Sequence, residues 1–418
     1  MDCAEHRDVA GDIQPLKRRR VLFCETNVDG TIGGSYYSLL YLVKGLDKIQ
    51  FAPLVLFHTE HILLDAFKSA GAEIVVWPKA GGFSFSARLP RVLGFLQAPL
   101  AVVQKAMNLV QGFFLSAVAR AVFIRRRSVD LVHLNNSILY NHDWMLAARL
   151  AGRPCVSHER GINEGYPAWA RFWGRRLDAI ICISEAVRGT MAAAGADFGN
   201  LHTIHNGFDP AEVRLQVPAA NLRRDLGIGA DDDVIVMVGN LKEWKGQTTL
   251  VKALDIVRKV RPTVRCLLVG ATAPADAAFE RELRALVAAL DLNQRVIFAG
   301  FRKNVADFIA LSDVVVHAST LPEPFGRVVL EAMACRRPVV GSRAGGVLEI
   351  VDDGATGLTF PPGDEVALAA AVGRLLADRT AARAMGDAGH RRLVDRFHID
   401  RNVQATEQLY ETLLARTP

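Results

Sequence analysis

Short apolar runs alternate with helix-like stretches along most of the chain. In the first half, runs rich in Val, Ile and Leu have the length of buried strands, and segments with apolar residues at helical spacing lie between them. These strand-like runs are residues 21–23, 53–57, 72–77, 130–134, 154–157, 178–183 and 201–205. Such alternation predicts parallel βαβ units with helices on both faces of a sheet.

Turn-forming residues interrupt the pattern at residues 205–218, and it then restarts. The second set of predicted strands is 234–238, 264–269, 295–298, 313–318 and 338–341, and the end of the chain is helical. We therefore predict an α/β protein with two doubly wound, Rossmann-like domains facing each other across a cleft, with ligands at the carboxyl ends of the strands. The predicted divisions are a flexible basic leader (1–20), an N-terminal domain (21–207), a C-terminal domain (208–390) and a final helix (391–418).

One loop in the second half combines the features of an anion site. After the strand at 313–318, two prolines and Gly326 break regular structure before an apolar helix begins. Unpaired amides at that helix N-terminus and the helix dipole favour a phosphate. Glu323 in the loop and Glu331 inside the helix can accept hydrogen bonds from hydroxyls. An anion beside a polyol indicates a sugar nucleotide.

Composition narrows the classes of protein. Half of the 418 residues are hydrophobic and 22% are charged, as in globular chains. The net charge of +6 favours anionic ligands or an anionic membrane face, and no basic run interleaved with aromatics indicates nucleic-acid binding. The six scattered cysteines lack metal-ligand spacing and predict reduced thiols in a cytoplasmic protein. We also expect no signal peptide and no transmembrane helix, because the polar residues interrupt every long apolar stretch.

Motifs for several other chemistries are missing. The sequence contains no Gly-x-Ser-x-Gly elbow, no His-Glu-x-x-His and no Gly-x-x-x-x-Gly-Lys-Ser/Thr phosphate loop. The first strand–turn lacks Gly-x-Gly-x-x-Gly, which disfavours a nicotinamide dehydrogenase.

The stretch from about residue 200 to 363 resembles the donor-binding half of the large retaining glycosyltransferase family 4, which has the GT-B fold. The Glu323-x7-Glu331 pair in its strand–loop–helix setting carries the resemblance. Further matching segments follow in the family's order, namely 183–185, 204–207, 238–241, 245–246, 268–270, 298–300, 344–350 and 353–357. The resemblance is sparser over residues 21–200. It implies that the final helix crosses back to the first domain.

The resemblance implies roles for the residues of this loop. In the family, the glutamate at the place of Glu323 contacts hydroxyls of the donor sugar, and the one at the place of Glu331 holds the ribose. Backbone amides at the places of Phe325, Gly326 and Arg327 approach the sugar and the diphosphate.

A cation is expected on the same wall. Lys245 follows a predicted strand and can neutralise the leaving diphosphate, which makes it a catalytic and donor-binding candidate with Glu323. The family usually has an arginine directly after the glycine that Gly239 matches, but Asn240 stands there. Either Lys242 substitutes for it, or the diphosphate has one fewer cation.

The first domain is expected to supply the opposite wall. Gly33 and Gly34 lie between the first strand and the first helix and allow close backbone approach; in the family this loop abuts the donor phosphates. His158 matches the family's cleft histidine, which contacts the donor sugar, and is our third catalytic candidate. Glu159 and Arg160 are candidates for acceptor binding.

Two further histidines are expected to be structural. We expect His133 to be packed or capping, and His205 to brace the interdomain turn.

The region 83–127 is the most individual part of the chain. Leu93, Leu96, Leu100, Val103 and Met107 recur at helical spacing, for which we favour a core face. The alternative is an amphipathic face on an anionic bilayer, to which the apolar cluster at 113–115 would add. A lipid-linked acceptor would fit that alternative.

The expected function is that of a retaining glycosyltransferase of hexosyltransferase type. It would move a sugar from a nucleotide-diphosphate sugar to a hydroxyl of a glycan or lipid-linked acceptor in polysaccharide, lipopolysaccharide or glycolipid biosynthesis. We expect no metal and no cofactor, because the Asp-x-Asp pattern of metal-dependent transferases is missing from the strand-end loops, and Asp231-Asp232-Asp233 matches a turn. The expected location is cytoplasmic, or peripheral on the cytoplasmic membrane face. The alternatives are a GT-B nucleotide-sugar epimerase and a non-catalytic sugar-nucleotide-binding subunit.

Overall fold

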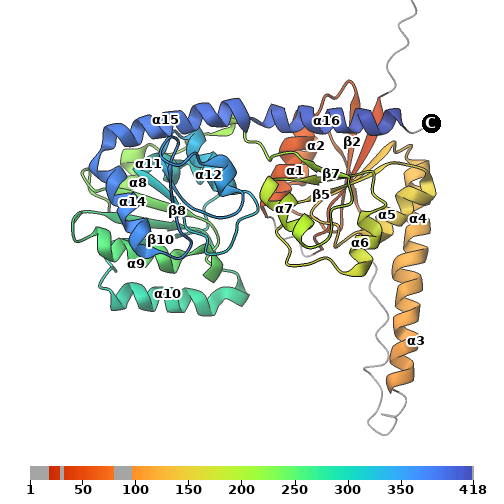
Figure 1. Ribbon diagram of the computed structural model, residues 1–418, viewed down its shortest axis with the longest axis horizontal. Helices are drawn as coiled ribbons and strands as arrows, with labels where there is room; N and C mark the ends of the chain where they lie inside the picture. The colour runs from red at the N-terminus through yellow and green to blue at the C-terminus, as the bar shows by residue number, and fades with distance from the viewer. Residues whose placement is uncertain (1–17, 29–32, 80–96, 417–418) are drawn as a thin grey trace, which may run out of the picture.

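Residues 18–28, 33–79 and 97–416 are described by the computed structural model. They form two parallel sheets, each covered by helices on both faces (Figure 1). This is the predicted two-domain α/β architecture.

The first sheet has the strand order β3-β2-β1-β4-β5-β6-β7. Its strands are β1 (Arg19–Cys24), β2 (Phe51–Phe57), β3 (Glu73–Val76), β4 (Leu131–Leu134), β5 (Cys155–Glu159), β6 (Ala179–Cys182) and β7 (Leu201–Thr203). The helices of this half are α1 (Gly34–Gly45), α2 (Leu64–Ser69), α3 (Gln97–Leu109), the π-helix η3 (Val110–Leu115), α4 (Ser116–Arg126), α5 (His142–Ala151), α6 (Ala168–Gly174) and α7 (Glu185–Ala193). The central strands β4, β5 and β6 are buried at every position; β6 is accordingly apolar throughout, whereas β4 includes His133 and β5 includes His158 and Glu159.

The second sheet has the order β10-β9-β8-β11-β12-β13. Its strands are β8 (Val234–Val238), β9 (Arg265–Val269), β10 (Val296–Gly300), β11 (Val314–His317), β12 (Val339–Ser342) and β13 (Leu358–Phe360). The helices are α8 (Ala219–Asp225), α9 (Gln247–Val257), α10 (Ala277–Ala289), α11 (Ala306–Leu311), α12 (Arg327–Ala334), α13 (Val347–Ile350), α14 (Glu365–Ala377), α15 (Arg379–Arg396) and α16 (Ile399–Ala415). Short 3-10 turns are η4 (Pro210–Glu212), η5 (Glu243–Lys245) and η6 (Pro274–Asp276).

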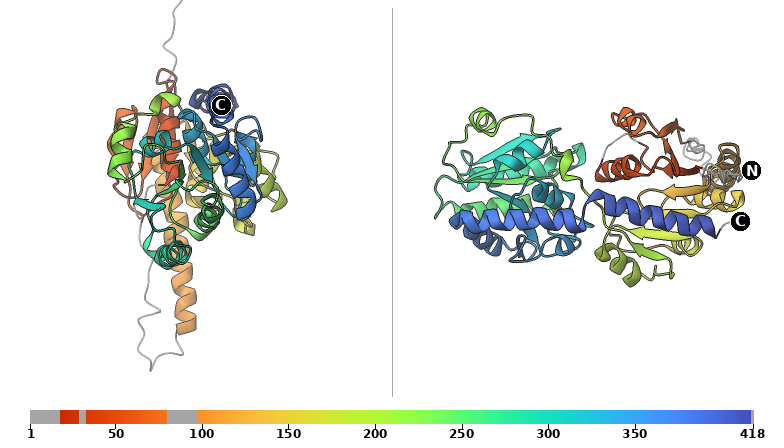
Figure 2. Two further views of the ribbon diagram at one scale, coloured as in Figure 1. Left: turned by 90° about the vertical axis from the view of Figure 1, so that its left-hand side faces the viewer. Right: turned by 90° about the horizontal axis from the view of Figure 1, so that it is seen from above.

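The helices α15 and α16 run across both domains, one after the other (Figures 1 and 2). α15 packs on α12 of the second domain, and α16 packs on α1 of the first. Tyr410 and Leu413 of α16 are buried in the same cluster as Leu39 and Leu42 of α1. The end of the chain is therefore part of the core of the first domain.

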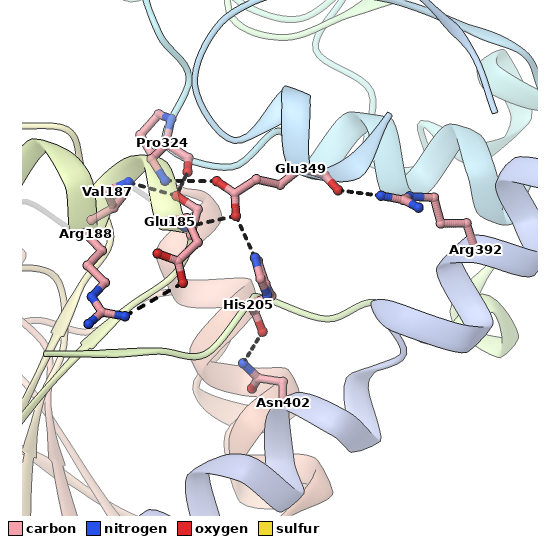
Figure 3. Close-up of polar contacts among 10 residues, drawn as sticks. Glu185, Val187, Arg188, His205, Pro324, Glu349, Arg392 and Asn402 are labelled. Atoms are coloured by element: carbon pink, nitrogen blue, oxygen red, sulfur yellow. Dashed lines mark hydrogen bonds and ion pairs between the residues drawn. The ribbon is translucent and has the colours of Figure 1, made fainter. Parts of the chain in front are cut away.

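A polar junction joins the domains beside this crossing (Figure 3). Glu349 of α13 accepts hydrogen bonds from the amides of Glu185 and Ala186, both at 2.9 Å, at the N-terminus of α7 in the other domain. It also lies 2.6 Å from Nε2 of His205, so the structure confirms the bracing role expected for that histidine. Burial alone would raise the pKa of Glu349, but these hydrogen bonds hold it below its usual value. An ionised Glu349 thus ties the two domains together at neutral pH.

The helix pair α3–η3 leaves the body of the first domain, as Figure 1 shows. Val103 is 49% exposed and Met107 is 40% exposed, so the core face favoured for them is wrong; Leu93 and Leu96 lie outside the described residues. Among the residues described, the continuous helix Ala98–Arg126 is long and apolar enough to cross a membrane, and 28% of its most apolar window is buried. Gln104, Lys105, Asn108 and Gln111 interrupt its apolar run, as the sequence indicated, and the expectation that the chain has no transmembrane helix stays a prediction.

Candidate active site

A cavity of about 870 Å³ lies between the two domains. Its walls are built from loops at the carboxyl ends of strands in both sheets, where parallel sheets bind ligands. Its size is within the range of small-molecule sites.

Most of the predicted site residues line this cavity. They are Gly33, Gly34, Arg160, Lys242, Lys245, Glu323, Phe325, Gly326, Arg327 and Glu331. His158 and Glu159 do not line it, and each is buried in strand β5.

Glu323 and Lys245 form an ion pair in the cavity. Nζ of Lys245 donates to Oε2 of Glu323 at 2.7 Å, and it lies 4.1 Å from the ring centre of Trp244. Ser319 donates to the same carboxylate oxygen at 3.1 Å, and Nε2 of His317 lies 3.5 Å away. Burial would raise the pKa of Glu323, but His317 and Lys245 lower it to about 2. Glu323 is therefore a permanent acceptor at neutral pH, beside a cation that a phosphate can engage.

Close backbone packing holds this loop in place. Gly345 has φ +62, and a Cβ atom there would lie 2.2 Å from the carbonyl oxygen of Glu323. Gly246, with φ +83, leads out of the Lys245 turn, and a Cβ there would lie 1.9 Å from the carbonyl oxygen of Ala318. The glycines that follow Lys245 and precede α13 are thus needed to bring the two halves of the ion pair together.

Glu331 lies inside α12, one turn beyond Arg327. Nη2 of Arg327 donates to Glu331 at 3.3 Å, while burial raises the pKa of Glu331. Nη1 of Arg327 reaches across to the other domain and donates to the carbonyl oxygen of Gly34 at 3.1 Å. Its guanidinium also lies over the rings of Tyr37 and Tyr41, at 5.3 and 5.8 Å. The sequence predicted only a backbone role for Arg327, because nothing in its pattern indicates a partner in a distant domain.

The role of the amides at the start of α12 stays a prediction, and Phe325 lines the cavity while its ring is turned toward the domain junction. Phe325 is 2% exposed and packs near the rings of His205 and Phe397 at the domain junction. Gly326, with φ +102, then turns the chain into the helix.

Several further cations line the same cavity as Asn240. Lys242 lines the cavity and lies 3.7 Å from Asp276 in a partly exposed ion pair. Arg302 and Lys303 line the cavity from the loop after β10, and the sequence reasoning missed them. Their position just beyond the end of a predicted strand was the available signal.

Arg160 lies on the wall contributed by the first domain. Its Nε donates to Asn135 at 2.6 Å, its Nη1 to Asn206 at 3.0 Å and its Nη2 to Nδ1 of His158 at 3.2 Å. Burial lowers its pKa to about 10, so it remains charged at neutral pH. The structure therefore holds a fixed cation at the place where acceptor binding was predicted.

His158 lies behind Arg160 in a buried chain of hydrogen bonds. Because arginine only donates, Nδ1 of His158 accepts, and its proton is on Nε2. His133 then donates from Nε2 to Nδ1 of His158 at 3.2 Å and accepts at Nδ1 from the hydroxyl of Tyr410. Burial lowers the pKa of His133 to about 3 and that of His158 well below its usual value, so both rings are neutral. Nε2 of His158 has no partner among the described residues, and the catalytic role of this histidine stays a prediction.

Glu159 does not fit the expected contact with an acceptor. Its side chain is 0% exposed and accepts hydrogen bonds from the amide of Ile138 at 3.1 Å and from Asn163 at 2.9 Å. It supports the loops on either side of the cavity wall instead. The prediction failed because β5 is covered on both faces, so its sequence does not reveal which side chains point to the cleft.

Replacing Glu159 with glutamine is expected to remove a pH dependence of stability. Burial raises the pKa of Glu159 to about 7, above the value of 4.5 for a free side chain. The folded state therefore keeps a proton that the unfolded state loses, and wild-type stability should fall by at most about 3 kcal/mol as the pH rises from near 4.5 to near 7. Urea unfolding over this pH range measures the slope. The exposed neighbour Glu164 provides the control Glu164→Gln, and identical profiles for Glu159→Gln and wild type would contradict the assignment.

No group of three His, Cys, Asp or Glu side chains suited to a metal ion is found within residues 18–28, 33–79 and 97–416. Metal independence stays a prediction. The arrangement observed is a cation, an ionised acceptor and a helix N-terminus at one wall, with a fixed arginine at the other.

Comparison with known proteins agrees with this arrangement. Residues 219–392 match the family model for glycosyl transferases group 1, and residues 61–212 match that for glycosyltransferase family 4. An N-acetyl-alpha-D-glucosaminyl L-malate synthase of Bacillus anthracis is 29% identical over 69% of this chain and 76% of its own. An alpha-maltose-1-phosphate synthase of Mycobacterium tuberculosis is 30% identical over 69% of this chain and 83% of its own.

Solved structures share the fold over nearly the whole chain. The structure of Anabaena HepE in complex with UDP-glucose matches with a TM-score of 0.74 and 27% identity, over 95% of this chain and 99% of that one. A glycosyltransferase from Rickettsia africae matches in fold with a TM-score of 0.77 at 18% identity, over 96% of this chain and 100% of that one. With the two facing Rossmann-like domains, these matches show that the chain belongs to the group 1, family 4 glycosyltransferases of the GT-B fold.

Proposed function

We propose that this glycosyltransferase moves a hexosyl group from a nucleotide-diphosphate sugar to a hydroxyl of a glycan or lipid-linked acceptor, with retention of configuration. The observation that carries the proposal is the Lys245–Glu323 pair beneath the N-terminus of α12. The related HepE has been solved with UDP and with UDP-glucose, and another relative, 29% identical, is a lipopolysaccharide core mannosyltransferase of Rhizobium meliloti.

The donor would lie against the second domain. Glu331 would accept from the ribose hydroxyls and Glu323 from hydroxyls of the sugar, while the amides of Gly326 and Arg327 approach the diphosphate. As the bond between the sugar and the phosphate oxygen breaks, negative charge grows on the diphosphate, and Lys245 stabilises it.

The acceptor would approach from the first domain, past Arg160. Its hydroxyl oxygen forms the new bond to the anomeric carbon on the face that the diphosphate leaves, and its proton passes to the departing phosphate oxygen. This route retains configuration without an enzyme nucleophile. We propose no metal and no cofactor, and a cytoplasmic or peripheral membrane location.

The ionised state of Glu323 supports transfer, because this carboxylate would accept hydrogen bonds from the sugar and would not exchange protons with it. An epimerase needs a cleft carboxyl that exchanges protons, but the neighbours of Glu323 lower its pKa to about 2. A non-catalytic sugar-nucleotide subunit has no need for a lysine poised at the diphosphate, and here Lys245 is both present and oriented.

A donor panel tests the proposal. Purified protein is incubated with UDP-, GDP- and ADP-linked hexoses in the presence of EDTA, with and without glycan and glycolipid acceptors, and released nucleotide diphosphate is measured. We expect release from at least one donor, and NMR of the product should show the donor's anomeric configuration. No release from any donor would refute the proposed reaction, and release that stops with EDTA would refute metal independence.

A further inference from the structure

The apolar helix that projects from the first domain has a surface unlike the rest of the molecule. Lys105 is the only charged residue in the segment 98–119, and none of the residues 98–116 is buried. Exposed apolar side chains along it include Val102, Val103, Met107, Leu109, Val110 and Phe114. Exposing such a surface to water is unfavourable, which indicates that an apolar partner or lipid covers this helix.

The position of these side chains favours lipid over a protein groove. At the helical spacing, Val102 and Met107 point about 140° apart around the axis, so a partner touching one of these faces would leave the other in water. A helix that is apolar around most of its circumference is typical of a membrane environment.

The base of the helix has the features of a membrane interface. Phe113 of η3 packs against Trp169 and Trp173 of α6, with ring centres 5.3 and 6.0 Å apart. Trp169 and Phe172 remain exposed there. Aromatic side chains concentrate at the boundary between lipid and water.

Basic side chains accompany this aromatic cluster. Arg176 lies 3.5 Å from the ring centre of Phe172, and its neighbour Arg175 is also exposed. These charges complement anionic headgroups, each contributing about 1 kcal/mol at a charged membrane surface.

The length of the projecting helix limits how deeply it can enter a membrane. Ser116 onward belongs to the body of the domain, because Ala117, Ala121 and Ile124 are buried and α4 packs on α5. Residues 98–112 precede this packed part of the helix and extend about 22 Å at the helical rise. Half a bilayer with its headgroups is roughly 20–22 Å thick. The long side chain of Lys105 can reach back to the headgroups.

We propose that α3 and the start of η3 insert into one leaflet of an anionic membrane, with the aromatic and arginine cluster at the headgroups. The helix α4 that follows this segment belongs to the first domain, so the segment enters the membrane from the side of that domain. The inference does not depend on the transfer reaction, but it would hold the acceptor wall of the cleft near a lipid-linked substrate.

Vesicle flotation with the full-length protein tests the insertion. We expect binding to vesicles of phosphatidylcholine with phosphatidylglycerol, and weaker binding to phosphatidylcholine alone. The double variant Val103→Asp/Met107→Asp should lose at least ~10-fold in partitioning, because it places two carboxylates in the hydrocarbon. The control, Val260→Asp/Val366→Asp, adds the same number of carboxylates at exposed apolar positions of the second domain and should bind as wild type does.

A probe measures the insertion directly. An environment-sensitive fluorophore on Met107→Cys should shift to the blue with anionic vesicles and be quenched by spin-labelled lipid tails. Unchanged flotation of the Val103/Met107 variant, or a probe that stays in water, would overturn the proposal. So would lipid-free self-association that the same double variant abolishes, since the helix would then bind a second copy. Release of nucleotide diphosphate with a soluble acceptor should be similar in both variants, which separates this test from that of the reaction.

Discussion

Replacing Lys245 with methionine is expected to lower the turnover number of sugar transfer by about 10²–10³-fold. Lys245 is the cation that contacts Glu323 in the cleft, and the developing charge on the diphosphate would lose its stabilisation. Because that charge is greatest in the transition state, turnover should fall more than donor affinity does. Steady-state kinetics with varied donor concentration separates the two quantities.

Lys242→Met provides the matched control. Lys242 lines the same cavity, but it lies near Asp276 and its side chain is 39% exposed, so its removal should cost far less. Thermal unfolding of the Lys245→Met variant checks its fold, since Glu323 keeps its contacts with His317 and Ser319. Turnover equal to that of wild type would contradict the role of Lys245. An equal loss of turnover in both variants would show that Lys242 also stabilises the diphosphate, in place of the family's arginine at the position of Asn240.

Replacing Glu331 with alanine is expected to weaken binding of the preferred nucleoside diphosphate by roughly 100-fold. Hydrogen bonds from ribose hydroxyls to a carboxylate contribute about 1.5–3 kcal/mol each, and the side chain is only 16% exposed. Isothermal calorimetry on the donor-free protein measures the affinity.

Glu282→Ala makes the same change on the exposed surface of α10 and should leave the affinity unchanged. Arg327 keeps its contacts with Gly34 and Tyr37 when Glu331 is removed, so the wall of the cleft should remain formed. Unchanged affinity of the Glu331→Ala variant would refute the ribose assignment.

The sequence predicted the structure best where the residue types of a short segment determine its conformation. Buried parallel strands are rich in apolar residues, so β6 and β8 could be located from their runs alone. Glycines in the loops beside the cleft were equally informative, because Gly246 and Gly345 leave no room for a side chain. The strand β13 was missed, since its three residues and its Thr359 are too short a pattern to distinguish from a turn.

The sequence did not predict the environment of side chains whose burial depends on neighbouring elements or on solvent and lipid. Helical spacing of Val103 and Met107 shows that a helix forms, but not whether protein, water or lipid covers it. The sequence placed His158 and Glu159 at the end of a strand, yet both are buried behind Arg160 because helices pack on either face of β5. The contact of Arg327 with Gly34 joins residues nearly three hundred positions apart, and no local pattern encodes it.

The return of α16 to the first domain also constrains how the protein can form during synthesis. The face of α1 that carries Leu39 and Leu42 is completed by Tyr410 and Leu413, and Tyr410 also closes the buried histidine chain. A growing chain therefore exposes this apolar face while the whole second domain is being made, although amino-terminal domains generally fold first. The first domain emerges first but reaches its final packing only after its partner, and it is in this interval that the chain should be most open to chaperones and most prone to aggregate.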